Sequence, residues 1–464
     1  MTSPAGTDSG LLAPTWAGSR AQAETTDEAF LRAMLDVEAA LAHAQAELGV
    51  VPAAAAATVR DACRAGRVDL GQVAVAARRT GNPVPGLVTA LTAVVAARDP
   101  EAAEHVHRGA TSQDVLDTAC MVVARRTLDL IAADLERTAV ALVGLVGAHR
   151  DTVQAGRTLT QHALPITFGL KAACWLQGVL DALARVRATA AALPAQLGGA
   201  AGTLAAYQEY ALLADASRPA PAVELAALFA AGVGLAEPLV PWHAVRTPIA
   251  DLGAVLGLVT GALGKLAVDV LTLSRTEIGE VGEPAAPGRG ASSAMPQKRN
   301  PVLATLVVSA ARQVPALALV LAQAMLAEDE RPAGAWHAEW QPLREALRLA
   351  GGAAEAAAEL AEGLRVHPGR MAENLRLTGG AILTERLNAR LAPVLGKAAA
   401  KGVLAEAVAE ADATGTTVAD RLAGLVPPDV LTTLLDPAGY LGAAGTLVER
   451  VLRRAGALVP GAAR

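Results

Sequence analysis

Four long apolar stretches with helical periodicity constrain this chain more than any other feature of its sequence. They cover residues 112–150, a segment after Pro165, residues 248–279 and residues 302–327. Their core must be built from Ala, Leu and Val, because hydrophobic residues make up 53% of the 464 positions and aromatic residues only 2%. Small aliphatic side chains favour close-packed helices over aromatic-rich sheets. The sequence therefore predicts an all-α protein with a bundle of long helices at its centre.

The chain is long enough for more than one domain, and its helical pattern changes twice along its length. Shorter helices are expected in residues 1–104. The long stretches fall within residues 105–350, and shorter helices return in residues 351–464. We therefore expect an N-terminal helical domain, a central helix bundle and a small C-terminal helical domain with these bounds.

Residues 288–301, GRGASSAMPQKRNP, combine flexible backbone, hydroxyl groups and positive charge in one short segment. Gly288 and Gly290 permit backbone conformations that other residues avoid, so this segment can fold over a small molecule instead of continuing a helix. Lys298 follows Ser292 by six positions, and its charge can hold a carboxylate and favour ionisation of a nearby hydroxyl. We interpret the segment as a mobile catalytic loop; the alternative is a polar surface loop with incidental serines.

Two further polar segments each open a long helix. Residues 105–114 read HVHRGATSQD, and residues 156–165 read GRTLTQHALP. Thr111 or Ser112 can act as a helix N-cap, and a helix N-terminus also attracts an anion, so the two roles are compatible. His162 lies in an apolar run, where a histidine is by itself more typical of a satisfied core residue than of a catalytic group.

The loop pattern GxSSxMPxKxNP closely resembles the signature of the fumarase/aspartase superfamily, and the other two segments resemble that superfamily's first and second regions. The resemblance implies that Ser292 acts as the acid or base and that His162 transfers a proton or holds the leaving or attacking group. The residues implied to bind substrate carboxylates are His107, Thr111, Ser112, Gln161, Lys298 and Asn300. Arg246 is a candidate anion contact, with an ion-paired surface arginine as the alternative.

The superfamily resemblance also implies an architecture. Its members share a three-domain all-α fold, and their tetramers bring the three regions from three subunits into one site. We therefore expect a homotetramer with shared active sites, acting on a small di- or tricarboxylate.

Outside the three regions, LLAPTWAG, TGNPVPGLVTAL and ERPAGAWHAEW resemble bacterial 3-carboxy-cis,cis-muconate cycloisomerases. That resemblance implies lactonisation of 3-carboxy-cis,cis-muconate to 4-carboxymuconolactone in protocatechuate degradation. One alternative is a C–N lyase that eliminates nitrite or an amine from a substituted succinate to give fumarate; another is a catalytically silent helical oligomer. Thr305 stands where fumarases and adenylosuccinate lyases have a glutamate, which argues against both. Two departures from the cycloisomerase pattern also occur: Arg108 replaces an expected aromatic residue, and Thr247 and Pro248 replace more usual charged residues.

Charge and motif content bear on cofactors, partners and location. Lys plus Arg is 40 and Asp plus Glu is 45, and this net charge of −5 gives no reason to expect nucleic acid or an anionic membrane as partner. The sequence has no dinucleotide fingerprint, P-loop or HExxH motif, so we expect no cofactor and no metal. Cys63, Cys120 and Cys174 are expected to be buried thiols, and the N-terminus lacks a secretory pattern, which predicts a cytoplasmic protein.

Overall fold

The computed structural model describes residues 9–215, 221–291, 294–459 and 461. Contacts between Cα atoms divide the chain into two compact units. Unit 1 comprises Met1–Asp134, Ala182–Gly261 and Leu306–Ala356, and unit 2 comprises Leu135–Asp181, Ala262–Thr305 and Ala357–Arg464. The division into three domains with the bounds given above stays a prediction.

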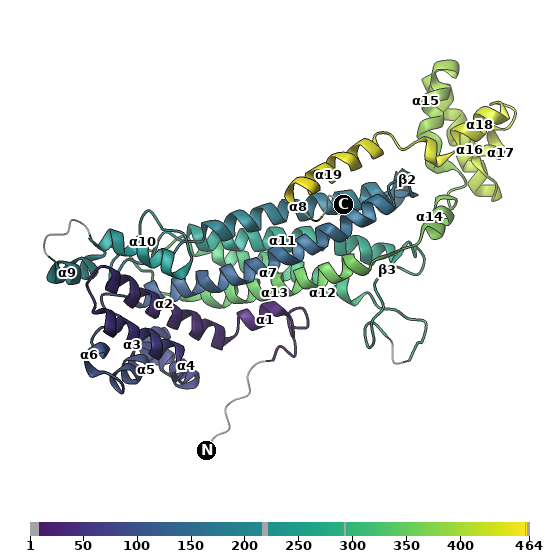
Figure 1. Cartoon of the computed structure of the whole chain (residues 1–464). Helices are drawn as coiled ribbons and strands as arrows, with labels where there is room; N and C mark the ends of the chain where they lie inside the picture. The colour runs from purple at the N-terminus through teal and green to yellow at the C-terminus, as the bar shows by residue number, and fades with distance from the viewer. Residues whose placement is uncertain (1–8, 216–220, 292–293, 460, 462–464) are drawn as a thin grey trace. The chain divides into compact units, whose positions relative to one another are not determined.

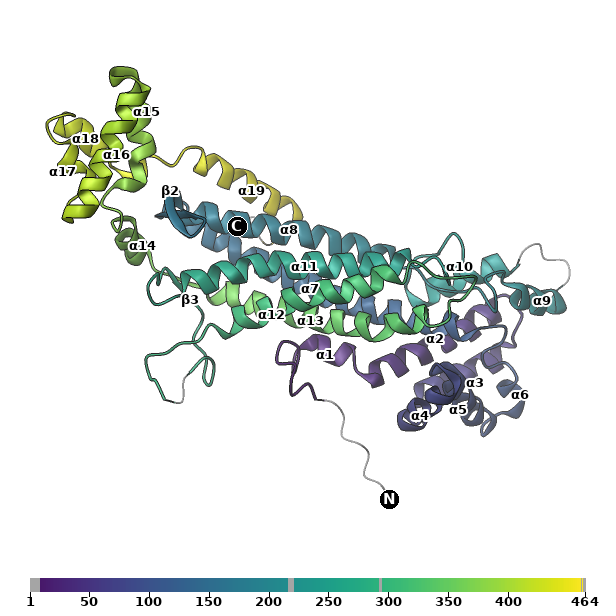
Figure 2. The same cartoon turned by 180° about the vertical axis from the view of Figure 1, so that it is seen from behind.

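Five long helices contribute segments to both units. They are α7 (Ser112–Ala148), α8 (Phe168–Ala192), α11 (Thr247–Leu273), α12 (Val302–Gln323) and α13 (Ala335–Gly363). Within each unit these segments run side by side, as both views of the cartoon show (Figures 1 and 2). Their facing positions carry fully buried leucine, valine and alanine side chains, such as Leu128 and Val259. The prediction of an all-α fold with a central bundle of long helices is therefore confirmed.

Shorter helices complete unit 1. They are α1 (Arg20–Glu24), α2 (Asp27–Glu47), α3 (Ala53–Arg64), α4 (Leu70–Thr80), α5 (Val84–Ala96), α6 (Pro100–Ala103), α9 (Ala205–Ala214) and α10 (Pro221–Val233). Thr26 caps α2 by accepting a hydrogen bond from the Ala29 amide. α2 packs against both α3 and α10.

Unit 2 adds two small antiparallel pairings and a cluster of short helices. The strands are β1 (Val153–Thr158), β2 (Gln161–Thr167), β3 (Val281–Gly282) and β4 (Arg365–Val366), with β1 paired to β2 and β3 to β4. The helices are α14 (Pro368–Leu375), η1 (Ala381–Leu383), α15 (Thr384–Leu395), α16 (Lys397–Thr414), α17 (Val418–Leu422), α18 (Pro428–Leu434), η2 (Pro437–Gly439) and α19 (Ala444–Leu458). The β1–β2 hairpin carries the second polar segment, and helical periodicity gave no sign of it.

Two further observations qualify the sequence-based expectations. Cys63 and Cys120 are buried as expected, but Cys174 is exposed on α8, so that expectation was wrong for one of the three thiols.

α11 and α12 are long and apolar enough to cross a membrane by length and composition alone, a test that core helices of soluble proteins also pass. Both helices retain exposed apolar side chains, including Leu258 and Leu319.

Candidate active site

The residues singled out from the sequence fall into two groups, each within one compact unit. His107, Thr111, Ser112 and Arg246 belong to unit 1, whereas Gln161, His162, Lys298 and Asn300 belong to unit 2. Ser292, the predicted acid or base, lies outside the described residues. Among the residues that the structure does describe, no cluster of three or more His, Cys, Asp or Glu side chains is arranged to hold a metal ion.

His107 lies in the turn before α7 and has a left-handed backbone, with φ of 57°. Its Nδ1 lies 2.6 Å from Oε1 of Glu38, a buried side chain on α2. Burial alone would lower the pKa of His107, but the hydrogen bond and charge of Glu38, together with the charge of Asp114, outweigh burial and raise that pKa. The imidazole is therefore held in one orientation and favours its cationic form, which suits contact with an anion.

Asp114, in the first turn of α7, organises the backbone around this segment. Its Oδ1 accepts the Gly198 amide hydrogen at 2.8 Å and lies 2.9 Å from Nε2 of His243, while Oδ2 accepts hydrogens from the Gly199 amide and the Tyr207 hydroxyl, both at 3.0 Å. All of these bonds are buried. Sequence reasoning did not single out Asp114, His243 or Tyr207. The aspartate two positions after Ser112 in the TSxD pattern was the available signal.

Thr111 and Ser112 stand at the start of α7. The Thr111 amide donates to Oδ2 of Asp114 at 3.2 Å, which is half of the reciprocal arrangement of a capping box. Both hydroxyls belong to half-buried residues, and within the described part of the chain neither makes a hydrogen bond. Two hydroxyls at a helix N-terminus suit an anion, because the positive end of the helix dipole lies there as well. Their role as substrate contacts stays a prediction.

Arg246 lies in the interior of unit 1, with 1% of its surface exposed. Its guanidinium bridges two buried carboxylates: Asp117, at 2.7 and 3.1 Å, and Glu339, at 2.6 and 2.9 Å. Nη1 also donates to the Trp242 carbonyl at 3.3 Å, so all five N–H groups are engaged. A direct bond from Arg246 to substrate would require one of these bonds to break. The observed contacts instead tie the residue that directly precedes α11 to α7 and α13.

The turn between β1 and β2 is strained. Its two residues, Leu159 and Thr160, both have positive φ, 47° and 70°, as a type I′ turn requires. Gly or Asn normally fills such positions, and a β-branched threonine there is an outlier. Leu159 is 96% exposed, so burial of its side chain does not compensate the strain. Strain of this kind concentrates at functional sites. Gln161, exposed, follows directly.

His162 is half-buried in β2, and its Nδ1 is buried without a hydrogen-bond partner among the described residues. Burial lowers the pKa of His162, the nearby charge of Arg157 lowers it further, and Glu280 only partly opposes them. The ring is therefore neutral near pH 7. Arg157 and Glu280 form a two-pronged ion pair, and Asn374 Nδ2 donates to Glu280 at 2.8 Å. Sequence reasoning missed this support because its members are far apart in the chain.

The backbone of the 288–301 loop explains its two glycines. Gly288 and Gly290 have φ of 75° and 67°, as the sequence led us to expect. The Asn300 amide donates to the Gly290 carbonyl at 2.9 Å, which closes the loop on itself. The side chains of Lys298 and Asn300 are exposed at this closure.

Glu283 fixes the point where this loop meets α12. Its carboxylate accepts the amide hydrogens of Leu303 at 3.0 Å and Ala304 at 2.7 Å, in the first turn of that helix. Burial raises the pKa of Glu283 in spite of these bonds. Thr305 is exposed, and its hydroxyl donates to the Pro301 carbonyl of the same turn at 2.7 Å.

Comparison with known proteins assigns the chain to a family. The family model described as Lyase matches residues 16–316. The chain belongs to the fumarase/aspartase superfamily. The chain is 58% identical over 455 residues to nitrosuccinate lyase of Streptomyces davaonensis, and the alignment covers 96% of the chain and 94% of that relative. It is 40% identical over 449 residues to 3-carboxy-cis,cis-muconate cycloisomerase of Bradyrhizobium diazoefficiens, covering 95% and 97%.

Among solved structures, the 3-carboxy-cis,cis-muconate lactonizing enzyme from Pseudomonas putida matches with a TM-score of 0.88 and 38% identity. The match covers 97% of this superfamily chain and 99% of that enzyme. The sequence-based superfamily assignment and fold are therefore confirmed, and the protein is an enzyme of this lyase superfamily.

The expectation of a cycloisomerase was wrong. Identity to the nitrosuccinate lyase, 58%, clearly exceeds the 40% to the cycloisomerase over nearly the same length. The expectation rested on LLAPTWAG, TGNPVPGLVTAL and ERPAGAWHAEW, and the greater identity to the nitrosuccinate lyase means that resemblance in these segments does not decide between the two activities. Arg108, one of the noted departures, donates to His105 Nδ1 at 2.7 Å and stacks on the Tyr210 ring.

Proposed function

We propose that this protein is a C–N lyase that eliminates nitrite from nitrosuccinate and produces fumarate. The observation that carries the proposal is the 58% identity to a nitrosuccinate lyase over 96% of the chain. The reaction removes a proton from the carbon beside one carboxylate and breaks the C–N bond on the neighbouring carbon. The bonding electrons leave with nitrite, and the proton passes to the base, so the products are fumarate, nitrite and one proton.

The loop residues have the chemical character this reaction needs. Removal of the carbon-bound proton places a second negative charge on the adjacent carboxylate, and preorganised donors stabilise such charge strongly. In our proposal Lys298 and Asn300 supply these donors, Ser292 is the base, and Thr111 and Ser112 hold the other carboxylate. Gly288 and Gly290 allow the loop to close over substrate and exclude water.

The environment of His162 supports nitrite as the leaving group. Nitrite is a stable anion and departs without taking up a proton, whereas hydroxide requires a proton donor. Because the pKa of His162 is lowered, little of it is in the imidazolium form at neutral pH, so it is a poor general acid there. The hydroxyl of Thr305, which stands where fumarases and adenylosuccinate lyases have a glutamate, donates to the Pro301 carbonyl just before α12. A neutral His162 can still donate or accept a hydrogen bond with the nitro group.

We further propose a homotetramer with shared active sites, located in the cytoplasm. The superfamily pattern builds one site from three subunits, and here the first region belongs to one compact unit while the second region and the loop belong to the other. Exposed apolar side chains on the long helices support assembly: Leu258 is 42%, Val268 45% and Leu319 60% exposed. Sedimentation or light scattering at several protein concentrations tests the oligomeric state.

The function is tested by incubating the purified oligomer with nitrosuccinate and measuring fumarate by ultraviolet absorbance and nitrite by a diazo-coupling assay. We expect the two products in equal amounts. Ser292→Ala and Lys298→Ala should each lower the rate by at least about 100-fold, whereas Lys397→Ala, at an exposed lysine on α16, should not. Aspartate serves as the parallel substrate for amine elimination. Unchanged nitrosuccinate with a folded oligomer would refute the proposal, and fumarate from aspartate alone would assign an ammonia lyase instead.

A further inference from the structure

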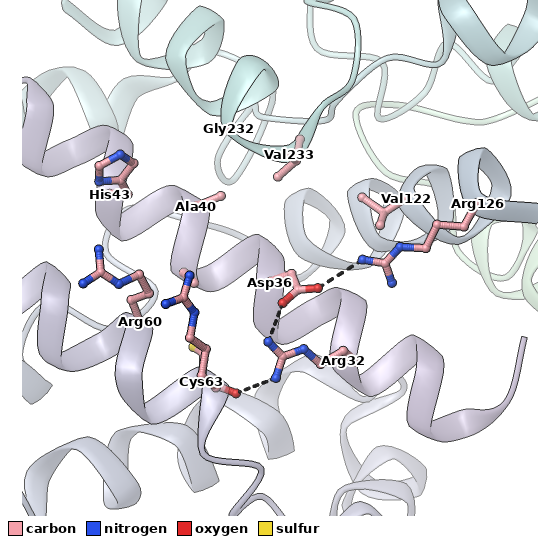
Figure 3. Close-up of a pocket in the computed structure, with 12 residues that line it drawn as sticks. Arg32, Asp36, Ala40, His43, Arg60, Cys63, Val122, Arg126, Gly232 and Val233 are labelled. Atoms are coloured by element: carbon pink, nitrogen blue, oxygen red, sulfur yellow. Dashed lines mark hydrogen bonds and ion pairs between the residues drawn. The ribbon is translucent and has the colours of Figure 1, made fainter. Parts of the chain in front are cut away.

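A cavity of about 420 Å³ opens in unit 1, between α2, α3, α7 and the end of α10 (Figure 3). None of its lining residues belongs to the three polar segments of the proposed active site. The volume lies in the range of small-molecule sites. The charged and polar side chains that line it are Arg32, Asp36, His43, Arg60, Arg64 and Arg126.

Helical spacing places these side chains together. Arg32, Asp36 and His43 occur at intervals of four and seven residues on α2, so they lie along one face of that helix. Arg60 and Arg64 are four residues apart on α3, which packs against α2. Figure 3 shows the labelled arginines arriving from three different helices.

Asp36 holds two of the guanidinium groups in place. Its Oδ1 lies 3.0 Å from Nη2 of Arg32 and its Oδ2 lies 3.2 Å from Nη2 of Arg126 (Figure 3). Arg32 also donates from Nη1 to the Cys63 carbonyl at 3.3 Å. One carboxylate is thus shared between two arginines, and it orients both while it neutralises only one of the two charges.

The two arginines of α3 are less fully paired. Nε of Arg60 is buried without a hydrogen-bond partner in the described chain, and the carboxylate nearest to it is that of Asp61, 3.7 Å away and 59% exposed. Arg64 makes no ion pair among the described residues. His43 is paired with Glu47, at 3.3 Å. Four arginines therefore line the cavity against a single lining carboxylate.

We propose that this cavity binds a small anion that carries two or more negative charges on carboxylate or phosphate groups. Arginine recognises both groups because its planar fork donates two parallel hydrogen bonds. Such an anion can accept hydrogen bonds from the accessible guanidinium groups of the lining arginines and offsets the excess positive charge. The site is separate from the nitrite elimination proposed above and does not depend on it.

Isothermal titration calorimetry of the intact oligomer tests the proposal, with fumarate, citrate and inorganic pyrophosphate as probes. Fumarate and citrate represent the carboxylate source and pyrophosphate the phosphate source. The titrations use Lys298→Ala protein, so that binding at the catalytic loop is weakened. We expect one anion per chain, and we expect Arg60→Gln/Arg64→Gln in that background to raise its Kd by at least about tenfold at low salt.

Arg79→Gln is the matched control, because Arg79 is an exposed arginine of unit 1 outside the cavity. It should leave the Kd within about twofold, the scale of a screened surface charge. If the double variant does not fold, the two single variants are measured in its place. Absence of saturable binding for all three probes, or equal Kd values in the cavity variants and the Arg79 control, overturns the proposal.

Discussion

Arg157 and Glu280 form a two-pronged ion pair within unit 2, with Nη1 to Oε2 at 3.0 Å and Nη2 to Oε1 at 2.7 Å. The Glu280 side chain is fully buried and that of Arg157 is 15% exposed. Arg157 pairs with His162 across the hairpin, and Glu280 directly precedes β3, which leads into the 288–301 loop. The pair therefore connects the second polar segment to the start of the loop segment.

Glu280→Gln should destabilise the protein by about 3 kcal/mol, because it removes a fully buried carboxylate and leaves the largely buried Arg157 without its partner. The matched control is Glu362→Gln, which breaks an ion pair of similar geometry with Arg137 in which both side chains are 43% exposed. That change should cost less than about 1 kcal/mol. Urea unfolding at equal protein concentration measures both. Equal losses in the two variants would contradict the role assigned to burial.

Arg246→Lys should cost about 2–3 kcal/mol of unfolding free energy although it conserves charge. A lysine ammonium has three donors on a flexible stem and cannot replace the five donors that bridge Asp117 and Glu339. Arg185→Lys is the control, because the Arg185–Asp251 pair is long, at 3.5 Å, and half exposed. Its cost should stay below about 0.5 kcal/mol. A near-neutral Arg246→Lys would show that the bridge is not required.

The stability contributed by His107 should fall as pH rises. Glu38 raises the folded pKa of His107 above its unfolded value of 6.5, so the stabilisation is complete below pH 6.5 and is lost as pH rises through the folded pKa. The measurement is the difference in unfolding free energy between wild type and His107→Gln, followed from acid to neutral and mildly alkaline pH.

His105 supplies a contrast of opposite sign two residues away. Burial, and then the charge of Arg108, lower the pKa of His105, so its contribution should be fully present above pH 6.5 and lost as pH falls below 6.5 through the folded pKa. The wild-type minus His105→Gln difference should therefore rise with pH below 6.5, whereas the His107 difference falls with pH above 6.5. Parallel trends for the two histidines would refute the assignment of Glu38 as the cause.

The helices were predictable from the sequence, whereas much of the site's support was not. The long stretch at 112–150 became α7, ending at Ala148, because apolar periodicity and the polar start are local signals. The β1–β2 hairpin escaped prediction because its turn residues, Leu159 and Thr160, have side chains that rarely adopt positive φ. Glu38 and Glu280 also escaped, since Glu38 contacts His107 from 69 positions away and Glu280 contacts Arg157, which pairs with His162, from 123 positions away. Contacts between residues so far apart in the chain produce no periodic pattern in the sequence.

Gly290 and Gly288 allow a matched test of the loop, because both have positive φ but only one is crowded. A Cβ on Gly290 would lie 2.4 Å from the Asn300 carbonyl oxygen, whereas a Cβ on Gly288 would meet nothing within 4 Å. Gly290→Ala must therefore force the two sides of the loop apart, while Gly288→Ala carries only the conformational cost of φ near 75°, about 1–2 kcal/mol. Because displacement of a reacting group by about 1 Å can cost about 100-fold in rate, we expect Gly290→Ala to lower kcat/KM for nitrosuccinate by about that factor and Gly288→Ala by much less. Thermal unfolding should show a Tm for Gly290→Ala no higher than that of Gly288→Ala, because the contact with Asn300 adds to a conformational cost that both variants carry. Equal rate losses would mean that backbone conformation, and not the approach of Gly290 to Asn300, is what the loop requires.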